Sequence, residues 1–106
     1  MSISITINTQ IIIIHNNTEN VLSHIYKLKD EIKEGSELII FICDSGSSIF
    51  YKYEFDYLPN SKLSPKKWLL NSVLYSLNSD KTKANIRELF NDILIQLNYE
   101  YNKSQD

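Results

Sequence analysis

Residues 37–57, ELIIFICDSGSSIFYKYEFDY, decide the fold of this chain of 106 residues. The run 37–43 is apolar at odd and even positions alike, which is typical of a central strand covered on both faces. Residues 44–47 have the composition of a turn, and residues 49–58 alternate in character as a second strand does. The stretch therefore predicts an antiparallel hairpin.

Alternation in the second strand separates an aromatic row from a charged row. One face receives Ile49, Tyr51, Tyr53, Phe55 and Tyr57, and the other receives Phe50, Lys52, Glu54, Asp56 and Leu58. The aromatic row either packs under helices, because tyrosine is a good strand former, or keeps several tyrosines partly exposed as an interface. A sheet whose second face is covered only in its middle favours a protein partner or a second copy of the chain.

The N-terminal segment has strand character up to residue 14. Isoleucines at the odd positions of residues 2–8 alternate with polar residues, and the run 11–14 is continuously apolar. One long bent strand accounts for this pattern. A hairpin turning at residues 8–10 accounts for it as well, although these residues lack the glycine that tight hairpins prefer.

Three helices are predicted from apolar positions at a spacing of three and four residues. The first runs over about 19–34 and ends at Gly35 as its cap. The second begins at Ser64-Pro65, since serine caps a helix and proline suits its first position. The third runs over about 81–101, before a tail, 102–106, that is expected to fray.

Length and order of elements predict one α+β domain over residues 1–106, with an antiparallel sheet of three or four strands packed by three helices in the order β(β)αββαα. The single cysteine, Cys43, excludes an internal disulfide and favours a reducing compartment. The N-terminus lacks the basic residue and cleavage site of a signal peptide. We therefore expect a cytoplasmic protein without a membrane segment.

Residue types that carry chemistry do not form a recognisable site. The sequence CDSGSS lies between two strands and does not fit the G-x-S-x-G nucleophile motif. His15, His24 and Cys43 match no metal-ligand spacing, and two glycines cannot build a phosphate loop. We expect no enzymatic activity, no metal and no cofactor.

Charge is distributed unevenly along the chain, whose net charge is −2. Residues 62–87 hold six basic residues against one acidic residue, whereas residues 1–61 hold four against eight. The basic block spans the predicted starts of two helices, where it adds to the positive field of the helix dipoles. Such a place attracts an anion or an acidic partner. The sequence pI of about 5.6 argues against nucleic acid.

Size, acidity and the lack of motifs resemble those of bacterial immunity proteins and phage inhibitors, although no residue pattern matches such a family. The preferred hypothesis is an interaction module that binds, and neutralises or escorts, a basic protein partner such as a nuclease toxin. Its expected contact residues are Asp44, Tyr51, Tyr53, Glu54, Asp56 and Tyr57. The alternative is an anion- or nucleic-acid-binding protein that uses Lys62, Lys66, Lys67, Lys81, Lys83 and Arg87.

Overall fold

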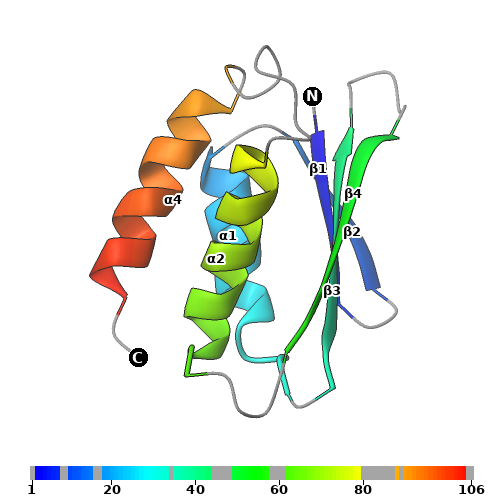
Figure 1. Cartoon of the computed structure of the whole chain (residues 1–106), viewed down its shortest axis with the longest axis vertical. Coiled ribbons are helices and arrows are strands. Elements are labelled where there is room, and N and C mark those ends of the chain that lie inside the picture. The colour runs from blue at the N-terminus through cyan, green and yellow to red at the C-terminus, as the bar shows by residue number, and fades with distance from the viewer. Residues whose placement is uncertain are drawn as a thin grey trace.

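A computed structural model describes most of the chain, namely residues 2–7, 10–15, 18–33, 35–43, 49–57, 62–79, 88 and 90–104. Its elements are β1 (Ser2–Ile7), β2 (Gln10–His15), α1 (Thr18–Leu28), β3 (Glu37–Cys43), β4 (Ile49–Asp56), α2 (Pro65–Asn78) and α4 (Asn91–Lys103). Figure 1 shows the helices packed beside a twisted sheet. The α+β class is thereby confirmed.

The sheet has four strands in the order β2-β1-β3-β4, and every neighbouring pair is antiparallel. The N-terminal segment is a hairpin, because β1 pairs with β2 from Ser2 opposite His15 to Ile7 opposite Gln10. The single bent strand is therefore wrong. Within the β3–β4 pair the register shifts after Ile42, so the strict alternation expected from the beginning of β4 is interrupted there.

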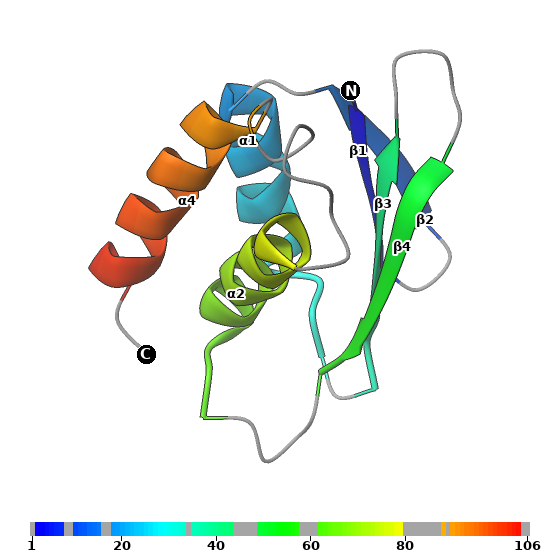
Figure 2. The ribbon, with the colours of Figure 1, turned by 45° about the horizontal axis from the view of Figure 1, so that its top comes forward.

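All described helices lie on one side of the sheet, and α4 is the farthest from it in both views (Figures 1 and 2). The side chains of β3 that face the helices, Leu38, Ile40 and Ile42, are fully buried. Ile39 and Phe41 on the other face stay half-exposed. The expectation that β3 is covered on both faces is thus wrong for the described part of the chain, because apolar character alone does not show which face receives a neighbour.

α2 lies between the sheet and α4 and is buried on most of its circumference (Figure 2). Two serines also lie inside, and each hydroxyl donates to the carbonyl one turn earlier: Ser72 to Trp68 at 2.8 Å and Ser76 to Ser72 at 2.9 Å. Each buried hydroxyl therefore has an acceptor, and its burial leaves no donor unsatisfied. The helix begins as predicted, with the Ser64 hydroxyl accepting from the Lys67 amide at 3.2 Å and Pro65 in the first position.

α1 ends at Leu28 and does not reach residue 34, which lies outside the described residues. The amide of Glu31 donates to the carbonyl of Leu28 at 2.9 Å, and this turn replaces the next helical turn. Continuing the helix to residue 34 would put the three carboxylates of Asp30, Glu31 and Glu34 at its negative end, whereas the turn returns the buried Ile32 to the core. Gly35 then takes a φ of 85°, a left-handed conformation that glycine adopts without strain.

The last helix is shorter at its start and longer at its end than predicted. It begins at Asn91, because the fully buried Phe90 sits in a turn with φ −106° and ψ 13°; residues 81–87 lie outside the description. The expected fraying is wrong for residues 102–104, since the Ser104 hydroxyl donates to the Glu100 carbonyl at 2.8 Å and secures the last turn.

The burial of the aromatic row of β4 can be tested by truncating Tyr53, which is 8% exposed. We expect Tyr53→Ala to lower the free energy of unfolding by about 3 kcal/mol, because it removes a large buried ring and leaves a cavity. Tyr99→Ala is the matched control; its ring is 59% exposed, and the expected loss is below about 1 kcal/mol. Urea unfolding measures both, and equal losses would contradict the core position of Tyr53.

Candidate functional site

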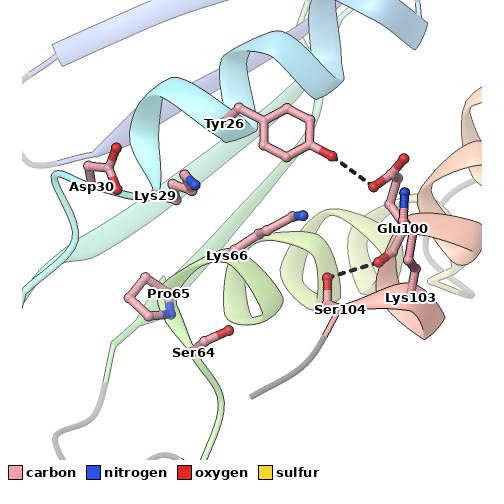
Figure 3. A pocket seen from close by; sticks show the side chains of 9 residues that line it. All are labelled: Tyr26, Lys29, Asp30, Ser64, Pro65, Lys66, Glu100, Lys103 and Ser104. Carbon is pink, nitrogen blue, oxygen red and sulfur yellow. Dashed lines mark hydrogen bonds between the residues drawn. The ribbon is translucent and has the colours of Figure 1, made fainter.

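Two surfaces on opposite sides of the molecule carry the described polar and exposed apolar groups. The first is the open sheet face, which we define as Glu37, Ile39, Phe41, Lys52, Glu54 and Asp56 of β3 and β4. The second is the helix-end pocket, a hollow of about 400 Å³ where the end of α1, the start of α2 and the end of α4 meet (Figure 3).

The open sheet face combines an apolar centre with an acidic rim. Lys52 places its ammonium 5.9 Å from the ring centre of Phe41 and 2.7 Å from a carboxylate oxygen of Glu54. Glu37 and Asp56 are direct partners in the register, and both are exposed. Like charges opposite each other on neighbouring strands are unfavourable, so this corner of the sheet carries excess negative charge that a cationic group would relieve.

The face continues onto the next strand in the backbone register. Thr6 of β1 is the partner of Ile39, and Ser4 is the partner of Phe41. No described helix crosses this side of the sheet (Figure 2). A docking molecule could therefore lie across both strands without displacing any part of the chain that the structure describes.

The structure places four of the six expected contact residues, two on each side of the sheet. Glu54 and Asp56 lie exposed on the open sheet face. Tyr53 and Tyr57 pack on the helix side, as the first interpretation of the aromatic row predicted: the Tyr57 ring lies 5.2 Å from that of Trp68. Asp44 and the side chain of Tyr51 lie outside the described residues.

The centre of the helix-end pocket is a hydrogen-bonded carboxylate. Tyr26 donates its hydroxyl to one oxygen of Glu100 at 2.7 Å, and the Gln96 amide donates to the other at 3.4 Å. Glu100 is only 9% exposed. The hydrogen bond to Glu100, with added contributions from burial and from the Glu100 charge, raises the pKa of Tyr26 above its ordinary value.

Part of the predicted basic block lies beside this pocket. Lys66 holds its ammonium 4.6 Å from the ring centre of Tyr26, and Lys67 lies 4.9 Å from that of Tyr101. Lys62 is exposed before α2. The three other members of the block, Lys81, Lys83 and Arg87, lie outside the described residues.

Sequence reasoning did not select two further lysines of the pocket, Lys29 and Lys103. Each belongs to a segment whose net charge is negative. Only the packing of α1 and α4 beside α2 brings them to Lys66, and no local signal in the sequence reveals that proximity.

His24 is a buried titratable group that is part of neither surface. It is 6% exposed, and its Nε2 atom has no hydrogen-bond partner among the described residues. Burial lowers the pKa of the imidazole, and the nearby charge of Lys27 lowers it further, while Glu31 acts in the opposite direction. No cluster of three metal-ligating residues is found within the described ranges.

Comparison with protein-family models, with curated proteins and with solved structures gave no match for this chain. Among the helices that the structure describes, none has the length and apolar character needed to cross a membrane. Because none of these comparisons gave a match, the function of the chain is inferred from its own residues.

The state of His24 predicts how stability depends on pH. The unfolded chain binds a proton near the ordinary imidazole pKa of 6.5, whereas the folded chain binds it only at lower pH. The contribution of the neutral imidazole to the free energy of unfolding is thus fully present above the pKa of the unfolded chain. It decreases as the pH falls toward the lower pKa of the folded chain. We expect urea unfolding of His24→Phe to show a flatter dependence between about pH 5 and 7 than the wild type. Parallel curves for the two proteins would contradict this coupling.

The carboxylate at the pocket predicts an effect on a neighbouring phenol. Glu100→Gln removes the charge and the strongest acceptor of the Tyr26 hydroxyl, so the pKa of Tyr26 should fall toward its ordinary value. Nuclear magnetic resonance of the tyrosine ring carbons against pH measures this change. The ring of Tyr75, on the exposed side of α2, is the control, and its carbon chemical shifts at neutral pH should be the same in both proteins. An unchanged Tyr26 curve would show that the hydrogen bond does not persist in solution.

Proposed function

We propose that the chain is a small cytoplasmic protein-interaction module that binds, and neutralises or escorts, one protein partner with a basic surface. The observation that supports the proposal is the open sheet face, where half-exposed Ile39 and Phe41 lie beside an acidic rim. A nuclease toxin is one partner of this chemistry. The single cysteine agrees with the reducing compartment that the proposal assigns.

Apolar and acidic groups have separate roles in this proposal. Ile39 and Phe41 lose water on docking, and buried apolar area is the main source of affinity at the centre of an interface. Glu37, Glu54 and Asp56 attract a cationic surface, which raises the rate of association and disfavours acidic partners. Tyr53 and Tyr57 have no place in this contact, because they support the sheet from its helix side.

A self-associating chain is the competing arrangement, since a second copy could also cover Ile39 and Phe41. The charges favour a different protein: two acidic rims brought together would repel, whereas a basic rim would be attracted. Light scattering of the purified chain separates the two arrangements, because the proposal requires a monomer in the absence of the partner.

Charge reversal of the rim is the direct test. The variant Glu37→Lys with Glu54→Lys should lose a basic protein that the tagged wild-type chain retains stoichiometrically from an extract of its own cells. The control, Glu88→Lys with Asp92→Lys, makes the same change in net charge at exposed positions near the start of α4, and it should retain the partner. Retention by the rim variant, or a dimer as the only complex of the wild type, would overturn the proposal.

A further inference from the structure

Lysines from three separate elements line the helix-end pocket: Lys29 follows α1, Lys66 lies in the first turn of α2, and Lys103 lies in the last turn of α4. Figure 3 shows the Lys66 side chain extending across the pocket toward Tyr26 and Glu100. Within the described part of the chain, none of the three ammonium groups forms an ion pair. The pocket therefore holds three positive charges without direct counter-charges.

The carboxylates of the pocket offset this positive charge only in part. Glu100 accepts hydrogen bonds at both oxygens, from Tyr26 and from Gln96. Asp30, the other carboxylate of the lining, is exposed to water beyond the end of α1, where charge interactions are weak. Three ammonium groups thus outnumber the two carboxylates, and the lining keeps a net charge of +1 (3 − 2), because the neutral donors Tyr26 and Gln96 leave the charge of Glu100 in place.

Lys66 occupies a position that is unfavourable unless an anion is present. The first turn of α2 contains no acidic residue, and a cation there opposes the positive end of the helix dipole. Lys29 and Lys103 differ in this respect, because cations at helix C-terminal ends are favourable. The ring of Tyr26 attracts the Lys66 ammonium at 4.6 Å, which holds it over the pocket. A bound anion would offset its repulsion by the α2 dipole.

We propose that the helix-end pocket binds a phosphate dianion, either free or as the monoester of a small molecule, with Lys29, Lys66 and Lys103 as its donors. A phosphate monoester carries a charge of about −1.5 to −2 at neutral pH and accepts hydrogen bonds from several directions, which suits a pocket that is lined by lysines from three parts of the chain. The pocket volume of about 400 Å³ exceeds the size of one phosphate group. Pro65 and the ring of Tyr26 line the remaining space for an organic substituent.

This inference does not depend on the proposed protein partner, because the pocket and the open sheet face lie on opposite sides of the sheet. It also differs from binding by the whole predicted basic block, since Lys29 and Lys103 lie outside that block. Lys67 has no donor role in it, because it does not line the pocket.

Nuclear magnetic resonance of the full, isotope-labelled chain tests the proposal with inorganic phosphate and with phenyl phosphate, at an ionic strength held constant with sodium chloride. We expect saturable shifts of the backbone amides around Lys66, Lys103 and Ser104. Lys66→Ala with Lys103→Ala should weaken binding by about tenfold for each lost charged contact. Lys52→Ala, on the open sheet face, is the control and should bind as the wild type does.

The two probes also distinguish the two sources of the group. Tighter binding of phenyl phosphate supports an ester ligand, and equal binding supports free phosphate. Shifts that rise linearly without saturation, or shifts that persist unchanged in the double variant, would overturn the proposal. The spectrum of the double variant without ligand shows directly whether it is folded, so failed binding cannot be confused with a failed fold.

Discussion

Burial of one side of β3 is the constraint on which the rest of the structure depends. Leu38, Ile40 and Ile42 are completely removed from water, and removal of apolar surface is the dominant favourable contribution to folding. α2 covers the sheet but is itself apolar on most sides, so it needs a second neighbour. α4 provides that neighbour, and Ile93 and Leu97 of this helix are buried together with Phe90 in the turn before it. The layers therefore follow in the order sheet, α2, α4, because α2 shields the sheet from water and α4 in turn shields α2.

The regular elements were predictable because their signals are local. The strand patterns of residues 2–7 and 49–56 and the Ser64-Pro65 start of α2 involve residues that are adjacent in sequence. The structure has a strand at each of the first two places and a helix start at the third. The end of α1 and the break at Phe90 were not predictable in the same way. At both places the helical spacing of apolar residues continues along the chain, and packing against distant elements decides where the backbone turns.

For the surfaces too, some features follow from neighbouring residues in the sequence and others depend on contacts between distant elements. The acidic residues of β4 could be assigned to an exposed row from alternation alone. Which row faces the helices, and whether anything covers the other, depends on the tertiary arrangement. The lysines of the helix-end pocket come from segments that are far apart in sequence, so their convergence is a property of the fold. A net charge of −2 therefore conceals an acidic surface on one side of the molecule and a basic pocket on the other.

The two-residue alternation of β3 separates packing from surface chemistry within one strand. Substitutions at Leu38, Ile40 or Ile42 alter the core and lower stability, whereas Ile39 and Phe41 are half-exposed and make no comparable contribution to packing. Residues 38–42 therefore alternate between positions that must stay apolar for the fold and positions whose side chains can be exchanged with a small loss of stability. The outer surface of β3 can be redesigned without a redesign of the core beneath it.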